Sequence, residues 1–241
     1  MYQCLGAAIV LPLYFAMFTW ASSKPGYFTS GREVPTAKVL LPSLILGYVI
    51  PTALMFFPFP FGSDLIAYQN LAAFWQPAPL YPNLLVFLFS LAPGLGSKQQ
   101  LARKDADVSH LKLVYLLAGI VSVASHVGLI YVCSVPGSGL SLSTVLLPDE
   151  ALRMKDMANG LLWIFQWDFI GTFSAALLWS WLSVVEVGQV AGQKATGGVV
   201  AVGTIGLLTV LGGPGAALTA VWLWREGKMA ESRAGARKKV L

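Results

Sequence analysis

The sequence predicts an all-α fold: a polytopic transmembrane helical bundle of about six to seven spans, with proline-broken helices around a central apolar cavity. The chain is 56% hydrophobic and 11% charged, with a mean hydropathy of +0.68, as is typical of polytopic membrane proteins. Several apolar runs are long enough to cross a hydrocarbon core of about 30 Å. We expect a single membrane domain at residues 1–225, followed by a basic C-terminal tail at 226–241.

Charge and motif content exclude several classes of function. The net charge of +5 comes largely from Arg225–Leu241, a pattern that orients a membrane protein rather than one that binds nucleic acid. Cys4 and Cys133 lie in or beside apolar runs, which argues against a disulfide framework. With only two His and no aspartate-rich motif, the sequence predicts no metal site. We expect a lipophilic small molecule and membrane lipids as partners.

The first two spans each contain proline. The first runs from about Leu5 to Trp20 and has no cleavage pattern, so we expect it to be retained as a membrane helix. The second runs from about Val39 to Phe57 and is interrupted by Pro42 and Pro51. Prolines inside a span free backbone carbonyls and kink the helix, and such kinks open pockets in a bundle.

The stretch Phe57–Gly94 combines amides and aromatic rings around a triple-proline segment at 77–82. We expect a short helix up to Trp75, an irregular turn, and an apolar helix from about Asn83 to Leu91. Irregular backbone at membrane depth is tolerated where it is buried in protein or lines a cavity. We therefore predict that this segment forms a pocket wall; a surface loop with interfacial aromatics is the alternative. The predicted substrate-binding residues here are Tyr68, Trp75, Gln76 and Asn83.

A further span, from about Lys112 to Cys133, carries a polar stripe of Tyr115, Ser122 and His126 on one helical face. We expect this stripe to point into the bundle. The simpler interpretation of His126 is a buried structural residue that hydrogen-bonds to a neighbouring hydroxyl. The alternative is a functional role for its imidazole. Beyond this span, Pro148 and the acids after it predict a helix start that can run on into the next span.

The span Met157–Glu186 is the centre of the prediction, because Asp168 lies close to its middle. An acid at mid-span is costly and normally faces the bundle interior. Asp168 shares a helix face with Trp179 and with Glu186, which lies at the far boundary. Glu186 is most simply an acid reaching water, and a polar gate is the alternative. Gln166 projects away from Asp168 and can bind substrate or a neighbouring helix. Trp167 and Trp179, with Trp75, are candidate cavity walls.

The last predicted span, from about Gly198 to Trp224, is rich in small residues and contains GGPG at Gly212–Gly215. Small residues permit close helix packing, and the proline allows a kink within one span. Trp222 and Trp224 mark a membrane interface. The charge distribution among the loops leaves the topology open.

These residues indicate acid–base chemistry in an apolar, aromatic cavity. We predict Asp168 as the proton donor and His126 as a group that relays a proton or accepts the last one. A carboxyl group in a water-poor site can remain protonated at neutral pH. Aromatic faces stabilise cations, and exclusion of water prevents their premature quenching.

The segments VPTAKVLLPSLILGYVIPTALMFFP, QNLAAFWQPAPLY and LLWIFQWDF resemble the membrane-bound terpene cyclases of fungal meroterpenoid biosynthesis, of the ascochlorin, ascofuranone and macrophorin type. The resemblance covers most of the chain. It implies a cofactor-free, metal-independent cyclisation of an aromatic polyketide with a farnesyl-type chain, often epoxidised at its end. It also implies an integral, multi-pass protein of the endoplasmic reticulum. The WEF-like acid of pyripyropene-type cyclases has no counterpart in this sequence, so that acid is not carried over.

Two other functions fit the same residues. A non-enzymatic sterol- or lipid-binding protein, or a sterol-isomerase-like enzyme, would also place acids and tryptophans in an apolar bundle. In a small transporter subunit, Asp168 would be a coupling site, although the sequence has no internal repeat of the kind common in transporters.

Overall fold

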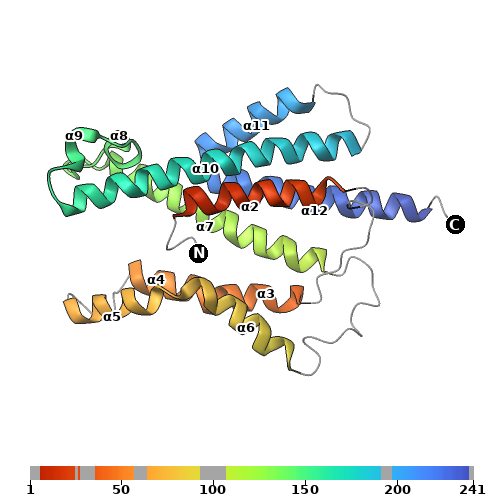
Figure 1. Ribbon diagram of the computed structural model, residues 1–241, viewed down its shortest axis with the longest axis horizontal. Helices are drawn as coiled ribbons and strands as arrows, with labels where there is room; N and C mark the ends of the chain where they lie inside the picture. The colour runs from red at the N-terminus through yellow and green to blue at the C-terminus, as the bar shows by residue number, and fades with distance from the viewer. Residues whose placement is uncertain are drawn as a thin grey trace. The chain divides into compact units, whose positions relative to one another are not determined.

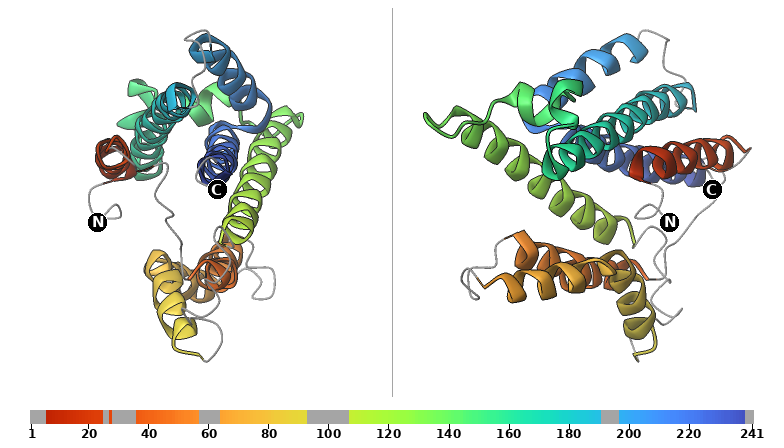
Figure 2. Two further views of the ribbon diagram at one scale, coloured as in Figure 1. Left: turned by 90° about the vertical axis from the view of Figure 1, so that its right-hand side faces the viewer. Right: turned by 60° about the vertical axis from the view of Figure 1, so that its left-hand side comes forward.

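The computed structural model describes residues 6–24, 27, 36–56, 64–92, 107–190 and 197–238. Among these residues the regular structure is entirely helical, which confirms the predicted all-α class (Figures 1 and 2). The chain forms two compact units: unit 1 is Met1–Ser30 with Tyr115–Leu241, and unit 2 is Gly31–Val114.

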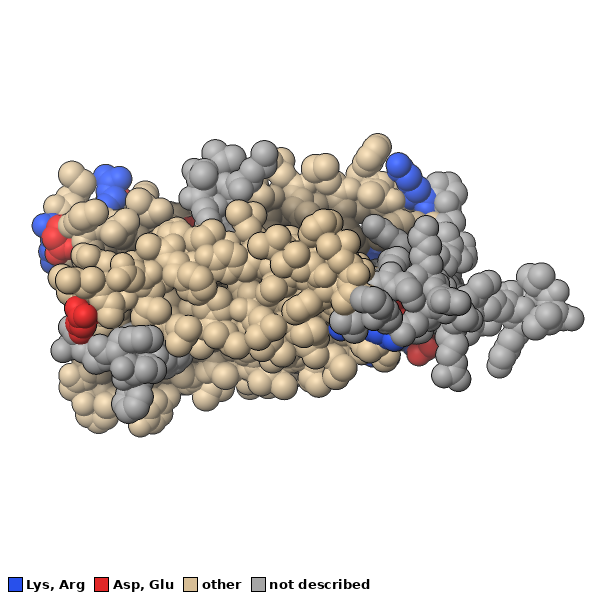
Figure 3. Space-filling view, turned by 90° about the horizontal axis from the view of Figure 1, so that it is seen from below, with Lys and Arg blue, Asp and Glu red and all other residues tan. Residues whose placement is uncertain are grey.

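Three helical stretches in the described part of the chain are long and apolar enough to cross a membrane: Ala37–Phe56, Val108–Ser134 and Met157–Gln189. Shorter apolar helices lie at Ala7–Ser22 and Gly198–Gly212. On the face that Figure 3 draws, most of the described residues are uncharged. These features fit a membrane protein.

The main pair of helices in unit 1 is α2 (Ala7–Ser22) and α10 (Met157–Val190), which lie side by side in Figure 1. The pair is parallel, because the start of α2 contacts Asp168 and its end contacts Glu186, further along α10. A Cβ atom built on Gly171 would lie only 2.7 Å from the Cβ of Ala8. Glycine at position 171 therefore allows α2 to approach α10 closely.

The predicted single span from Gly198 to Trp224 is wrong. The structure has two helices, α11 (Gly197–Gly212) and α12 (Pro214–Lys238), which pack against each other through Ile205, Ala217 and Val221. Gly213 between them has a φ of +87°, a conformation that favours glycine, and Pro214 starts the new helix without an N–H to donate. The chain therefore ends one helix and begins another here. The boundary predicted at residue 225 falls inside α12.

Helix α7 (Val108–Ser134) confirms the span predicted from about Lys112 to Cys133, and the part of it in unit 1 meets α12. The ring of Tyr115 stacks on Trp222 at a centroid distance of 5.8 Å. Further along the same face, the hydroxyl of Ser122 occupies the space where Gly215 would carry a Cβ atom. The predicted polar stripe of α7 therefore faces the interior of unit 1.

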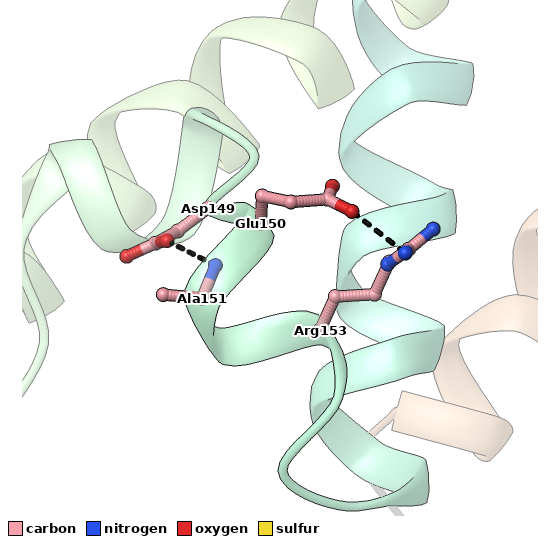
Figure 4. Close-up of polar contacts among 4 residues, drawn as sticks. All are labelled: Asp149, Glu150, Ala151 and Arg153. Carbon is pink, nitrogen blue, oxygen red and sulfur yellow. Dashed lines mark hydrogen bonds and ion pairs between the residues drawn. The ribbon is translucent and has the colours of Figure 1, made fainter.

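The helix start predicted at Pro148 is confirmed, but this helix does not run on into α10. Helix α9 (Glu150–Arg153) begins where Asp149 accepts a hydrogen bond from the Ala151 N–H at 2.8 Å (Figure 4). Asp156 starts α10 in the same way, accepting from the Asn159 N–H at 2.8 Å. This hydrogen bond lowers the pKa of Asp156. Each aspartate caps a separate helix, so the chain breaks between them.

In unit 2, the second predicted span consists of α3 (Ala37–Leu44), a π-turn η1 (Ile45–Val49) and α4 (Ile50–Phe56). The π-turn is closed by a hydrogen bond from the Ile50 N–H to the Ile45 carbonyl and comes directly before Pro51. Pro51 has no N–H, and its ring crowds the carbonyl of the preceding turn. A wider turn relieves this crowding, which explains the predicted interruption.

The break predicted in the triple-proline segment is also confirmed. Helix α5 (Leu65–Trp75) is followed by a short 3₁₀ helix η3 (Ala78–Leu80) and then by α6 (Tyr81–Ser90). The start of α6 packs against the π-turn of the second span, where a Cβ atom on Gly47 would lie 2.7 Å from the backbone nitrogen of Pro82. Glycine is needed at position 47 for this close contact between two segments of backbone.

Candidate functional site

Asp168 is half-buried on α10, and its side chain faces the beginning of α2. Its Oδ1 atom accepts a hydrogen bond from the Ala8 N–H at 2.8 Å. The first N–H groups of a helix have no partner within the helix, and Gly6, at the N-cap position, has no side chain that could serve as one. Asp168 therefore caps α2 from a neighbouring helix.

The backbone of Gly6 lies close to this carboxyl group. Gly6 has a φ of +79°, and a Cβ atom on it would lie 2.9 Å from Oδ1 of Asp168. Among the residues that the structure describes, Oδ1 has the Ala8 N–H as its hydrogen-bond partner, and Oδ2 has none. One oxygen thus fixes the orientation of the carboxyl group, while the other is left for a further interaction.

A second acid of α10 holds the other end of α2. The hydroxyl of Ser22 lies 3.3 and 3.4 Å from the two carboxyl oxygens of Glu186 and is oriented to donate to them. Ser22 is almost completely buried, and Glu186 is half-buried. The sequence placed Asp168 and Glu186 on one helix face, and the structure shows that this face binds both ends of α2.

Aromatic rings fill the space near Glu186. The ring of Trp179 stacks on Phe15 at 5.2 Å and on Trp222 at 4.5 Å, and Phe18 meets both tryptophans edge-on. The buried guanidinium of Arg225 lies 5.2 Å from the centre of the Phe18 ring. We call Phe15, Phe18, Trp179 and Trp222 the aromatic cluster. Trp179 is only 2% exposed in this packed cluster, so its role as a cavity wall stays a prediction.

Gln166 is bound to a neighbouring segment. Its Nε2 donates to the carbonyl oxygens of Thr144 at 2.9 Å and Val145 at 3.1 Å, in the short helix α8 (Leu142–Leu146). The last carbonyl groups of a helix lack partners within it, so the buried amide satisfies them. The sequence left two partners open for Gln166, substrate or a neighbouring helix. The structure shows a contact with a neighbouring helix, and a contact with substrate stays a prediction.

His126 lies at the break between α11 and α12. Its Nε2 is 3.0 Å from the carbonyl oxygen of Val210, and a carbonyl can only accept, so Nε2 carries the proton. In a continuous helix this carbonyl would bind the N–H of residue 214, but Pro214 has none. The histidine is therefore satisfied by a carbonyl group and not by the hydroxyl that we expected. Its role as a proton relay stays a prediction.

The substrate-binding residues predicted in and around the triple-proline segment belong to unit 2. Trp75 donates from its indole nitrogen to the hydroxyl of Thr52 at 3.0 Å. Asn83 donates to the carbonyl of Pro79 at 3.2 Å, and its side chain is exposed. Tyr68 and Gln76 are exposed as well. Trp75 and Asn83 thus bind different segments of unit 2, and a common role of the four side chains in a pocket stays a prediction.

An open apolar groove lies at the junction of α9 and α10, in unit 1. It has a volume of about 460 Å³ and is lined by Arg153, Met154, Met157, Gly160, Leu161, Trp163 and Ile164. We call it the α9–α10 groove. The guanidinium of Arg153 lies 5.0 Å from the centre of the Trp163 ring, and its Nη2 lies 2.7 Å from Oε1 of Glu150 (Figure 4).

Sequence reasoning missed this groove, because it forms only where the chain breaks before α10. The exposed Trp167, predicted as a cavity wall, lies next to it and contacts Trp163 at 6.2 Å. No group of three or more His, Cys, Asp or Glu side chains that could hold a metal ion occurs in the part of the chain that the structure describes. Independence from metals stays a prediction.

Comparison with known proteins shows similarity along most of the chain. It is 27% identical to the terpene cyclase ascI of Acremonium egyptiacum, over 92% of this chain and 60% of that protein. It is 31% identical to the terpene cyclase rstn5 of Aspergillus nomiae, over 96% of this chain and 63% of that protein. It is 26% identical to the terpene cyclase ctvD of Aspergillus terreus, over 94% of this chain and 65% of that protein.

The chain thus spans less than two thirds of the length of these relatives. No solved structure matches it. The profile of the CtvD domain matches residues 1–229, nearly the whole chain. The resemblance drawn from the sequence is confirmed: the chain belongs to the CtvD domain family.

Proposed function

We propose that the protein is an integral, multi-pass membrane terpene cyclase of fungal meroterpenoid biosynthesis, in the endoplasmic reticulum. Its substrate is an aromatic polyketide that carries a prenyl chain with a terminal epoxide. Two findings support this proposal: the similarity to proteins named terpene cyclases, over 92% to 96% of this chain, and the long apolar helices. A lipophilic substrate of this kind enters the protein from the bilayer.

The reaction begins when a carboxylic acid donates its proton to the epoxide oxygen. The carbon–oxygen bond breaks, the oxygen becomes a hydroxyl group, and the resulting cation is attacked by the π-electrons of the next alkene. New rings form until a proton is lost from the last cation, which regenerates an alkene. The reaction is an isomerisation and consumes no reductant or oxidant, so the proposal includes neither a metal nor another cofactor.

The observation that carries the proposal is the geometry of Asp168. The Ala8 N–H holds Oδ1, so the proton to be donated belongs on Oδ2. A hydrogen bond that fixes the carboxyl group also fixes the direction of proton donation, which general acid catalysis requires. His126 is the candidate for the last proton: because Nε2 donates to Val210, Nδ1 is the ring nitrogen left to accept it.

The experiment must separate catalysis from capping, since Asp168 also binds α2. Asparagine caps a helix about as well as aspartate, and its side-chain oxygen can still accept from Ala8. It has no carboxyl proton to donate. In membranes containing the chain, supplied with an epoxidised farnesyl phenol, Asp168→Asn should lower the rate of cyclisation by roughly 10²–10⁴. The amount of protein and its melting temperature should stay close to those of the wild type. Turnover at the wild-type rate would refute Asp168 as the acid.

A further inference from the structure

We infer that the α9–α10 groove binds the aromatic head and the first part of the prenyl chain of the substrate, and directs the far end of the chain to Asp168. This inference rests on the proposed function and adds to it a binding site and an orientation. The groove lies outside the site residues predicted from the sequence.

The groove lies on the same stripe of α10 as Asp168. Ile164 precedes Asp168 by one helical turn and Leu161 precedes it by two, so all three lie on one stripe of the helix. One turn is a rise of about 5.4 Å. Helix α2 begins at the level of Asp168 and runs away from the groove, so it leaves this part of the stripe open. The groove therefore leads along α10 to the carboxyl group.

The walls of the groove suit an isoprenoid chain. The side chains along α10 are apolar, and Met157 adds a flexible side chain that can adapt to an irregular chain. A volume of about 460 Å³ lies within the range of small-molecule sites, roughly 300–1,000 Å³. An isoprenoid chain has no polar group that such walls would leave unsatisfied.

Arg153 fixes the direction of the substrate. Its side chain is partly exposed, its ion pair with Glu150 uses Nη2, and its Nη1 has no hydrogen-bond partner among the described residues. A partly exposed guanidinium with an unused donor favours an arriving acceptor oxygen, such as a phenol oxygen or a carboxylate. Arg153 belongs to α9, at the charged end of the apolar helix α10. The polar head of the substrate therefore lies at Arg153 and the far end of its chain points towards Asp168.

Cross-linking tests this placement without relying on turnover. The probe is a farnesylated phenol with a diazirine on its aromatic ring and no epoxide, applied to membranes containing the full chain. We expect labelling of the peptide containing residues 153–164, equally in the wild type and in Asp168→Asn. An excess of farnesylated phenol should compete for labelling. Labelling elsewhere, or equal competition by a phospholipid, would overturn the inference; the second result would make the groove a lipid site.

Two substitutions test the groove by turnover. Leu161→Trp fills it, and Leu178→Trp is the matched control, because Leu178 is also an exposed leucine of α10, outside the groove. Leu161→Trp should lower kcat/KM by about tenfold or more, mainly through KM, while Leu178→Trp stays close to the wild type.

Arg153→Met should raise KM by about tenfold, and Glu150→Gln, which leaves the guanidinium in place, should have less effect.

The two proposals fail in different ways. If the wild type cyclises the epoxide, and Leu161→Trp and Arg153→Met have the same kcat/KM as the wild type, the groove inference is refuted and the proposed function stands. If the probe labels the groove but neither the wild type nor any variant cyclises, the binding site is upheld and the proposed function is refuted.

Discussion

The two ends of the α2–α10 pair carry the same type of side chain in different surroundings. At one end, Asp168 binds the Ala8 N–H, and at the other, Glu186 binds the Ser22 hydroxyl. Both acids join the two helices. Asp168, however, lies on the stripe of α10 that leads to an open apolar groove, whereas Glu186 lies near packed aromatic rings and the buried Arg225.

This difference shows why an acid at membrane depth is insufficient evidence for a catalytic role. Both oxygens of Glu186 interact with Ser22, so the carboxyl group is used in holding α2. Asp168 uses one oxygen for the same purpose, and its other oxygen has no hydrogen-bond partner among the described residues. A proton donor needs a structural contact to orient it and a second oxygen that a substrate can reach. On this criterion we favour Asp168.

The largest expected effect on stability is at the Glu186 end. Trp179 is 2% exposed within the aromatic cluster, whereas Trp167, at the other end of α10, is 49% exposed. Trp179→Ala should destabilise the protein by about 3–5 kcal/mol, because a large buried ring leaves a cavity. Trp167→Ala should cost much less. The fraction of protein that stays monodisperse after heating in detergent measures both. Equal losses would contradict the assignment of the packed core to the Glu186 end.

A smaller effect is expected where α2 approaches α10 at the Asp168 end. Gly171→Ala places a methyl group 2.7 Å from the Cβ of Ala8, so the two helices must shift. Such overpacking typically costs about 1–3 kcal/mol. Gly203→Ala is the control, because nothing lies within 4 Å of a Cβ atom at that position of α11. If both variants melt at the same temperature, the close contact between α2 and α10 is refuted.

The sequence predicted those features that depend on local chemistry. The apolar runs of α7 and α10 determine their lengths, and prolines determine the breaks near Pro51 and Pro77. The inward face of α10 also follows from the position of Asp168, since a mid-span acid avoids lipid.

The features that sequence reasoning missed depend on which distant segments meet. The GGPG segment is compatible with a kinked span and with two packed helices, and only the contact of Ile205 with Ala217 and Val221 favours the second. Nothing local to Asp168 indicates that it caps α2. The groove, likewise, depends on the separate caps at Asp149 and Asp156, which end one helix and start the next.

No effect is expected from removing divalent metals. The sequence lacks an aspartate-rich or multi-histidine ligand set, and the proposed first step needs only a carboxylic acid. Cyclisation by washed membranes should proceed at the same rate with and without EDTA. A rate that falls with EDTA and recovers with Mg²⁺ would point to ionisation of a diphosphate, and would remove Asp168 from the role of initiating acid.

The most direct test compares Asp168→Asn with Glu186→Gln. Both substitutions exchange a carboxyl group for an amide of similar shape, and both leave an oxygen that can accept the hydrogen bond from α2. The measurement is the amount of cyclised product from an epoxidised farnesyl phenol, at equal amounts of folded protein. We predict that Asp168→Asn loses roughly 10²–10⁴ in rate while Glu186→Gln retains most of its activity. Loss of cyclisation in Glu186→Gln, with turnover retained in Asp168→Asn, would contradict the account and move the acid to the other end of α2.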